Sequence, residues 1–352
     1  MNIIQSNSIP LDKVIMDISD SLNTKLIQEC SEFTLEIPPE WGEGTIKAID
    51  FQNGLGLIRY DCTFKEDLEI RFIVNDVHPL KFLYGLEGEF HHRFENEEEL
   101  HKIKQYQNAI VASSGNNGHI LYFKGNNKTA INSLEVTRFD FREQLKCELK
   151  TLEKTLSDLF NDVKAVKSFY FKGYYSLVIA HLFNKILDLG DGDFARRIFL
   201  EGIAYNMLGE EILHYQDSLK KDGDGTKGLL SRIEVKLIDE ATLVIKNNLG
   251  DLGTIEDISK QVGLNANKLQ DGFQKVYGKS VNGYVKQERL DLASYLLLNT
   301  DKQMGEIVEI IGLNSKSYFS KIFREAYGVS PLQFRKTNFT EKQQRIQKKY
   351  EK

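Results

Sequence analysis

An internal duplication near the end of the chain constrains its fold more than any other feature of the sequence. Residues 255–265 and 304–314 share one pattern of apolar and polar positions, and both segments end in Gly-Leu-Asn. The segments that follow, residues 266–277 and 315–327, also match each other, at an offset of 50 in place of 49. A short helix, a glycine turn and a second amphipathic helix make the helix-turn-helix pattern. The duplication therefore predicts two such units in tandem.

Within each unit the apolar spacing separates a buried face from an exposed face. Apolar side chains at helical spacing pack inward, and a glycine after the first helix can take the left-handed conformation that ends it. Ser280 and Ser330 are expected to cap the helix that follows each unit, with Pro331 at the first position of the second of these helices. The predicted helix-turn-helix core is Ile258, Gly263, Leu269, Phe273, Ile307, Gly312, Phe319 and Phe323.

The polar side chains left on the outer face of each second helix suit recognition of double-stranded DNA. Amides can bond adenine, lysine and arginine can bond guanine, and every cation can meet a phosphate. A helix predicted over residues 281–298 spans a little under ~30 Å, which would hold two reading helices about one DNA turn apart. The predicted DNA-binding residues are Asn267, Lys268, Gln270, Asp271, Gln274, Lys275, Lys316, Ser317, Ser320, Lys321 and Arg324.

The distribution of charge agrees with a DNA-binding part at the end of an otherwise acidic chain. The net charge of the whole chain is −5. Residues 229–352 hold 20 basic and 15 acidic side chains, whereas residues 1–228 hold 26 basic and 36 acidic ones. The two parts therefore carry about +5 and −10, an asymmetry that suits an acidic sensing part joined to a basic DNA-binding part.

The first 140 residues are expected to form a small antiparallel β-barrel. Short alternating segments recur between residues 45 and 138, and turn signals such as Gln52-Asn53-Gly54 separate them. Amphipathic helices are predicted over residues 141–161, 167–187 and 193–219, the last capped by Asp193. The predicted fold class is α+β, a cupin-like barrel with helices followed by an all-α domain.

This pattern predicts five segments along the chain. Residues 1–140 form a β-rich sensor domain, and residues 141–220 form a helical connector or dimerisation region. Residues 221–228 are polar and glycine-rich and form a linker. Residues 229–338 form the DNA-binding domain, and residues 339–352 form a basic tail that either adds phosphate contacts or is disordered.

The remaining reactive residue types do not form a catalytic pattern. His91, His92 and Glu95, with His78, His101 and His119, could suggest a metal site in the barrel. Adjacent histidines on a strand point to opposite faces, so surface histidines are the preferred interpretation and no metal is predicted. The three cysteines are widely spaced, which favours reduced thiols and a cytoplasmic protein. Neither a catalytic constellation nor a membrane-spanning run is present, so the sequence predicts neither an enzyme nor a membrane protein.

The region from about residue 229 to residue 337 resembles the AraC/XylS family of bacterial regulators. The most recognisable stretch is residues 312–324, followed by Gly-Val-Ser-Pro at 328–331. The part before it resembles, more weakly, the siderophore-responsive PchR-like branch, in residues 50–55, 82–89 and 199–202. In that branch the first half senses a small molecule and often dimerises.

The resemblance implies a transcription regulator whose effector is a small molecule or siderophore and which needs no cofactor. Its implied partners are double-stranded DNA, a second copy of the chain and RNA polymerase. An alternative stays open, in which the first half only dimerises or binds a protein partner. The operator, the effector and the choice between activation and repression are not determined by the sequence.

Overall fold

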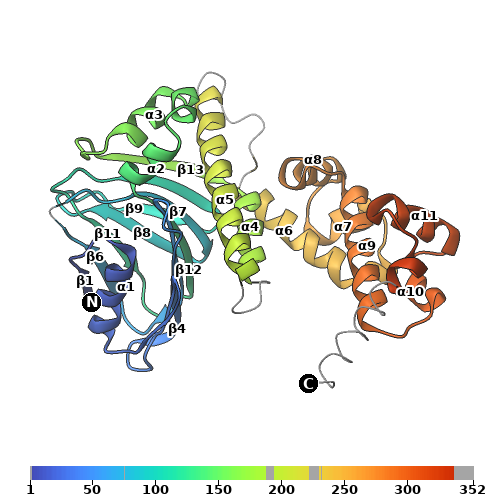
Figure 1. The fold of residues 1–352 in the computed structure, drawn as a ribbon. Helices are drawn as coiled ribbons and strands as arrows, with labels where there is room; N and C mark the ends of the chain where they lie inside the picture. Colours follow the sequence, from blue (N-terminus) through green and yellow to red (C-terminus); the bar gives the residue numbers. More distant parts are fainter. Residues whose placement is uncertain (1, 75, 188–193, 222–229, 231, 337–352) are drawn as a thin grey trace. The chain divides into compact units, whose positions relative to one another are not determined.

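A computed structural model describes residues 2–74, 76–187, 194–221, 230 and 232–336 of the chain. Its internal contacts divide the chain into two compact units, residues 1–229 and 230–352 (Figure 1). The first unit mixes strands and helices, and the described part of the second unit is all helical. The predicted cap Asp193, nearly all of the predicted linker and the basic tail lie outside the described residues.

Two sheets form the framework of the first unit. The strand order is β13-β10-β7-β12-β5-β4-β3-β2 in the larger sheet and β1-β6-β11-β8-β9 in the smaller one. The larger sheet contains β2 (Leu26–Glu29), β3 (Glu32–Glu36), β4 (Gly42–Asp50), β5 (Leu55–Phe64), β7 (Leu80–Glu87), β10 (Gln107–Ala112), β12 (Thr129–Val136) and β13 (Phe169–Tyr175). The smaller sheet contains β1 (Asn2–Ser6), β6 (Leu68–Phe72), β8 (Glu89–Phe94), β9 (His101–Lys104) and β11 (His119–Phe123).

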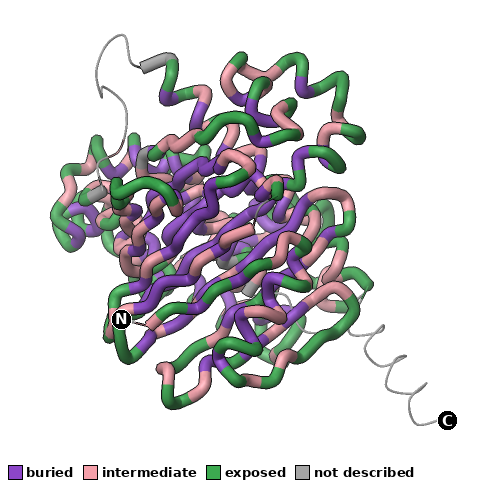
Figure 2. The backbone as a smooth tube through the Cα atoms, turned by 90° about the vertical axis from the view of Figure 1, so that its left-hand side faces the viewer, coloured by how far each residue is buried: buried purple, intermediate pink, exposed green. Residues whose placement is uncertain are grey.

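The main apolar core lies between the two sheets. Alternate residues of each strand point into this space, as the two-residue period of a strand requires. The ring of Phe123 on β11 lies 5.6 Å from that of Tyr60 and 5.4 Å from that of Phe64, both on β5. Figure 2 shows the resulting band of buried strands in the middle of the unit.

Helices cover the outer face of the larger sheet. These are α3 (Lys154–Asn161), α4 (Leu177–Leu187) and α5 (Phe194–Lys221). Phe82 on β7 packs against Phe160 on α3, and Tyr84 on the same strand stacks on Phe183 of α4. Strands β10 and β12 are therefore buried on both faces, and all of their residues are buried.

The prediction of a closed, cupin-like barrel is wrong, because the two sheets are open. No strand ladder joins them anywhere in the described residues, and β1 pairs with β6 in the parallel sense. Helix α1 (Leu11–Leu22) lies beside β1, β3 and β4 (Figure 1). Its buried side chains, which include Val14, Ile15 and Ile18, cover the opening on that side. In a barrel, backbone hydrogen bonds between strands would close this gap. Here the apolar side chains of a helix cover it.

Two of the predicted helices are also corrected. Residues 141–161 form no single helix but α2 (Arg138–Gln144), a 3-10 turn (Glu148–Thr151) and α3. The break occurs because the Glu153 carboxylate accepts hydrogen bonds from the amides of Thr155 and Leu156 and so starts α3. Residues 169–175, predicted as helix, form β13 because they pair with the exposed edge of β10, and helix α4 begins only at Leu177.

The second unit is a bundle of short helices. In order they are α6 (Arg232–Asn247), α7 (Ile255–Val262), α8 (Ala266–Tyr277), α9 (Val281–Asn299), α10 (Met304–Ile310) and α11 (Lys316–Tyr327). A 3-10 turn (Leu249–Asp251) precedes α7. Among the described residues of the whole chain, no helix combines the length and the apolar character that crossing a membrane requires.

Candidate nucleic-acid interface

Helices α7 and α8 form the first helix-turn-helix unit, and α10 and α11 form the second (Figure 1). The turn of each unit contains a glycine in the left-handed region, Gly263 with φ 74° and Gly312 with φ 70°. Side chains with a Cβ rarely adopt this conformation. The amide of Gly263 bonds to Lys260, and that of Gly312 to Glu309, so both turns satisfy free carbonyls at the helix end.

Each second helix begins at a polar side chain that caps it. Asn265 accepts a hydrogen bond from the amide of Lys268 at the start of α8, and Ser315 accepts one from the amide of Tyr318 at the start of α11. Ser280 caps α9 in the same way. These caps fix where each helix starts, and therefore which of its side chains face outward.

The buried faces of α8 and α11 repeat the same aromatic pattern. Phe273 lies 5.1 Å from Tyr277 in α8, and Phe323 lies 4.5 Å from Tyr327 in α11, measured between ring centroids. The non-glycine members of the predicted core are all buried: Ile258, Leu269, Phe273, Ile307, Phe319 and Phe323. Ala326, which the periodicity places inward, is exposed.

The outer face of α8 is largely neutralised by its own surroundings. The Lys268 ammonium lies 2.7 Å from the carboxylate of Glu234, and Lys275 pairs with Asp271 one turn earlier in the helix. Gln270 is half-buried, and its carbonyl oxygen accepts a hydrogen bond from the amide of Val281. Within α8, the predicted contact residues that are exposed and that form no side-chain hydrogen bond or ion pair with the described residues are Asn267 and Gln274.

Gly272 in α8 has a packing role that the sequence did not reveal. A Cβ atom at this position would lie 2.2 Å from Cδ1 and 2.8 Å from Cγ1 of Ile238 on α6. Ile238 is fully buried, so it has little space to move. The glycine lets α8 approach α6 closely, which offsets the lower helix propensity of glycine.

The outer face of α11 carries unneutralised positive charge. Lys316, Lys321 and Arg324 are exposed, and the described residues contain no ion pair to any of them. Ser317 is exposed and Ser320 is half-buried, so both hydroxyls lie on the surface of the helix. A shallow surface pocket on this helix is lined by Ser320, Lys321, Arg324 and Glu325.

Tyr318 is a further candidate that the periodicity did not single out. It lies in the first turn of α11 and is half exposed. The first residues of a recognition helix are those that contact base edges. An exposed aromatic ring at this position can pack against a thymine methyl group or a sugar.

The first unit contains a layer of histidines between its two sheets, where the sequence predicted surface residues. His78, His92 and His119 are each at most 3% exposed. The ring of His119 lies 4.9 Å from that of His78 and 5.8 Å from that of His92. His101 on β9 stacks on Tyr170 of β13 at 3.7 Å, so this pair bridges the free edges of the two sheets. We call these five residues the histidine layer.

Several polar atoms of the histidine layer have no hydrogen-bond partner in the described structure. They are both ring nitrogens of His92 and of His119, Nε2 of His78 and the hydroxyl of Tyr170. Burial lowers the pKa of His78 to about 4 and that of His92 to about 3, and holds the pKa of His119 well below its usual value. The imidazoles of His78, His92 and His119 are therefore neutral at pH 7, and each can donate one hydrogen bond and accept one.

A buried ion pair lies beside this layer. Lys81 on β7 pairs with Glu135 on β12, and both side chains are buried. The Lys81 ammonium also lies 4.9 Å from the centre of the Phe72 ring. Because its positive charge disfavours a second cation, Lys81 further lowers the pKa of all three buried histidines. In the described residues, no three His, Cys, Asp or Glu side chains are grouped as ligands of one metal ion.

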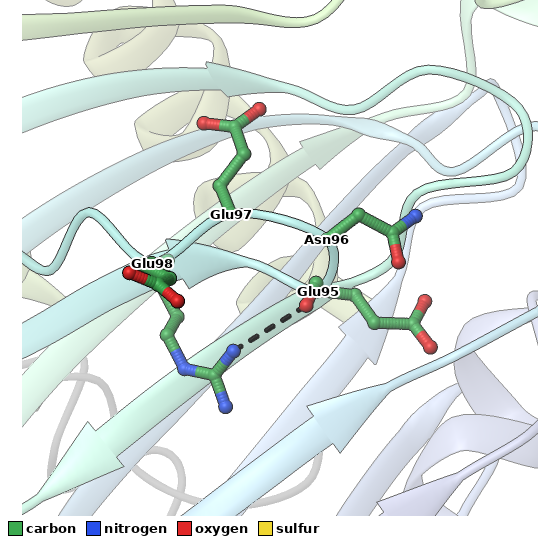
Figure 3. Close-up of a pocket in the computed structure, with 5 residues that line it drawn as sticks. Glu95, Asn96, Glu97 and Glu98 are labelled. Carbon is green, nitrogen blue, oxygen red and sulfur yellow. Dashed lines mark hydrogen bonds between the residues drawn. The ribbon is translucent and has the colours of Figure 1, made fainter.

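His91 and the acidic run at 95–99 lie outside this layer. His91 packs against Tyr122 on the opposite face of β8 from His92, as the strand period predicts. The loop after β8 forms an open pocket lined by Arg93, Glu95, Asn96, Glu97 and Glu98, whose carboxylates point in different directions (Figure 3). Glu95 accepts a hydrogen bond from the amide of Gly118, and residues 96–99 are exposed, so this is a solvated loop.

Two family comparisons cover most of the chain. The family described as regulatory protein PchR N-terminal domain matches residues 42–224. The family described as helix-turn-helix domain matches residues 258–337. The first match spans more than half of the chain, and the second contains α8 to α11.

Three similar proteins each match less than half of the chain. An uncharacterized HTH-type transcriptional regulator, YisR of Bacillus subtilis, is 31% identical over 97 residues, which are 28% of this chain and 34% of that protein. The Msm operon regulatory protein of Streptococcus mutans is 27% identical over 140 residues, 40% of this chain and 48% of that protein. The chain thus spans between a third and a half of the length of these relatives. The solved C-terminal domain of AraT, a response regulator from Geobacillus stearothermophilus, is 30% identical, with a TM-score of 0.28, and covers 29% of this chain and 84% of that domain.

Proposed function

The chain belongs to the AraC/XylS family of regulators and carries a PchR N-terminal domain, and we propose that it is a sequence-specific, DNA-binding transcription regulator that responds to a small molecule. The observation that carries the DNA-binding part is the exposed and unneutralised row of Lys316, Lys321 and Arg324 on the second helix of a helix-turn-helix unit. Because its target is DNA, we place its action in the cytoplasm.

The two reading helices contribute unequally in this proposal. On α11 three cations are available to phosphates and base edges, whereas on α8 both lysines are paired with carboxylates. We assign base reading at one half of the site to Lys316, Ser317, Ser320, Lys321 and Arg324. We assign the weaker contacts at the other half to Asn267 and Gln274, with Lys268 and Lys275 free to contact phosphate only after leaving their carboxylates.

The test of this assignment is Lys321→Ala, with Lys236→Ala as its charge-matched control. Lys236 is an exposed lysine on α6, outside both reading helices. Once genome-wide mapping of bound DNA has identified the operator, titration by fluorescence anisotropy measures its affinity. Loss of Lys321 is expected to weaken operator binding by about 1–3 kcal/mol if this side chain reads a base. Equal affinities of the two variants for the operator would refute the assignment.

The salt dependence of binding gives a second measurement on the same variants. Each phosphate contact releases counterions, so affinity falls steeply as salt rises. If Lys321 meets a phosphate and no base, its loss reduces the slope of log affinity against log salt by about 1 and weakens all sequences alike. A flat salt response of the parent protein would contradict the phosphate contacts altogether.

The histidine layer supports a small-molecule site in the first unit. Buried polar atoms nearly always have hydrogen-bond partners, and this layer has several that do not. A small molecule with both donors and acceptors, bound between the sheets, would supply the missing partners. We propose this layer as the effector site, with Lys81 and Glu135 as its charged neighbours.

A thermal-shift screen of the full chain tests the effector site. Iron-siderophores are the first compounds to screen because of the likeness to PchR, and sugars are the second because a xylose operon regulatory protein is among the relatives. A ligand of this site is expected to raise the unfolding temperature of the parent protein and to have no effect on His92→Phe. A shift that persists in His92→Phe places the ligand elsewhere. No shift from any compound favours the alternative in which the first unit only dimerises or binds a protein.

The remaining partners follow from this function. Each chain has two reading helices for the two halves of one site, so a second copy would read a second copy of that site, and the two-fold symmetry of the protein would mirror the repeat in the operator. We therefore propose a homodimer, and RNA polymerase as the protein through which a bound regulator would act. Both proposals are tested by co-purification of the full chain with an operator fragment.

A further inference from the structure

Arg138 is a buried cation whose charge the described residues neutralise only in part. It is the first residue of α2, just after strand β12, and its side chain is fully buried. Nη1 of the guanidinium donates a hydrogen bond of 2.8 Å to the backbone oxygen of Asp162, but the carboxylate of Asp162 lies 3.8 Å from that nitrogen. This carboxylate already accepts hydrogen bonds from the amides of Val166 and Lys167. Because arginine stays protonated and a buried charge is costly unless it is paired, a further anion would stabilise Arg138.

The two other nitrogens of this guanidinium, Nε and Nη2, have no hydrogen-bond partner in the described structure. They form one edge of the planar group, with two parallel N–H bonds. A carboxylate matches this edge, because its two oxygens can accept both bonds at once. Buried polar groups nearly always have partners, so a fully buried guanidinium with a free edge has the shape and the charge of an oxyanion site.

Other buried hydrogen-bond donors gather at the same end of the larger sheet. The end of β10, the start of β7 and the end of β12 lie side by side there. Ser113 follows β10, His78 precedes β7 and Arg138 follows β12, each within two residues of its strand. Oγ of Ser113 and Nε2 of His78 have no partner among the described residues, and both side chains are buried. A hydroxyl, an imidazole and a guanidinium can all donate hydrogen bonds, so together they suit an anion.

Arg138 lies close enough to the histidine layer for its charge to act there. It lowers the pKa of His78 and of His119, as the charge of Lys81 also does. Lys81 is paired with Glu135, whereas no carboxylate of the described residues lies at hydrogen-bond distance from Arg138. A monovalent carboxylate balances the single charge of Arg138. A phosphate dianion would leave excess negative charge in the interior, which is costly.

We propose that Arg138 binds a carboxylate group of the effector, and that Ser113 and His78 donate further hydrogen bonds to it. The rest of the effector extends between the sheets toward His119 and His92, whose rings lie 5.8 Å apart. The inference rests on the effector site proposed above and adds the class of its ligand, a carboxylic acid bound as the anion. A neutral sugar lacks this group, so the compounds to be screened are narrowed to acids.

Two pairs of small probes test this ligand class on the full chain, acetate with acetamide and benzoate with benzamide. The members of each pair have nearly the same shape, but only one carries a carboxylate. Ligand-observed NMR titration is expected to show that at least one carboxylate binds about tenfold or more tightly than its amide, since a hydrogen bond to a charged group is stronger. Arg138→Lys keeps the charge and loses the paired N–H bonds, so it should weaken carboxylate binding about tenfold or more. Arg142→Lys, at a half-buried arginine one turn later in the same helix, should leave the affinity unchanged.

Ser113→Ala is a second variant, with little change in volume, and it should also weaken carboxylate binding if Arg138→Lys does not fold. Far-ultraviolet circular dichroism establishes the folding of each variant. Carboxylates that do not bind, that bind no better than their amides, or that bind equally to Ser113→Ala and the parent chain overturn the inference. Inorganic phosphate that binds more tightly than the carboxylates at the same site overturns the choice of a carboxylate. If a neutral compound raises the unfolding temperature of the parent chain but not of His92→Phe, the effector site stands and only its ligand class is wrong.

Discussion

Acidification should destabilise the first unit more steeply than ordinary surface titration would. The buried histidines His78, His92 and His119 are neutral in the folded state because burial lowers their pKa, to about 4 and about 3 for the first two. In the unfolded chain each returns to a pKa of about 6.5. Between these values the unfolded chain binds more protons, so stability is fully present above pH 6.5 and is lost as the pH falls.

The slope of the free energy of unfolding against pH depends on how many buried groups titrate and on the direction in which each pKa is shifted. Each buried histidine contributes up to about 1.4 kcal/mol of lost stability per pH unit in this window. Glu211 on α5 has the opposite effect on the stability of the unit, because burial raises its pKa to about 8. The stability that it contributes is complete below pH 4.5 and is lost as the pH rises toward 8. Three histidines against one glutamate leave a net slope of about 2.7 kcal/mol per pH unit between pH 5 and 6. Above pH 7 only the opposite slope of Glu211 remains, so the stability of this unit is expected to peak near pH 7.

Trp41 allows the first unit to be measured alone. It is the single tryptophan of the chain, and it packs against the core between the sheets. Urea unfolding followed by its fluorescence, at pH values from 5 to 8, gives the free energy of unfolding of this unit. His92→Phe keeps an aromatic ring beside Phe94 and Tyr170 and removes one titrating group, so the acid slope should fall by about 1.4 kcal/mol per pH unit. An unchanged slope in this variant, or a flat profile in the parent, would refute the reasoning.

Three further predictions concern single contacts. Glu211→Gln keeps the hydrogen bond to Asn108 and should abolish the loss of stability between pH 7 and 8 in the same urea experiment; a persistent loss would exclude Glu211 as its source. Gly272→Ala should destabilise the second unit by about 1–3 kcal/mol through overpacking, and Ile238→Val, which removes the closest clashing atom, should recover part of this in thermal unfolding; additive effects of the two changes would contradict the contact. Ser315→Ala should cost about 1 kcal/mol by removing the cap of α11, and an unchanged unfolding temperature would contradict this.

The helices predicted over residues 266–277, 281–298 and 315–327 match α8, α9 and α11 to within one residue because their signals are local. A cap, an apolar period and a terminal glycine lie within a dozen residues of each other, and these interactions form in the same way in any context. The predicted helix at 266–277 matches α8 in full. Periodicity could not predict which of the outward-facing side chains already form a hydrogen bond or an ion pair with another helix. Gln270 faces the start of α9, and Lys268 faces Glu234 on α6, and both contacts depend on how helices pack.

In the first unit the errors arise where distant segments meet. Residues 169–175 have helical spacing on their own, but the edge of β10, about 60 residues earlier, offers hydrogen bonds that only a strand can accept. The barrel was predicted from strand spacing alone. Whether a sheet closes depends on its edges, and here α1 and the stacked pair of His101 and Tyr170 lie where a closing strand would be.

The histidines show most directly why the interior was misjudged. Strand alternation predicted that His91 and His92 point to opposite faces, and they do, but alternation cannot tell which face is inside. The register decides it. Leu121 of β11 lies opposite His92, and His119 of β11 lies opposite Phe94, so both imidazoles point toward the core. Neutral imidazoles that are spread over some 40 residues of sequence thus form one layer only after the sheets form. The candidate effector site therefore depends on the whole fold. The candidate DNA contacts, in contrast, could be predicted from the sequence of a single helix.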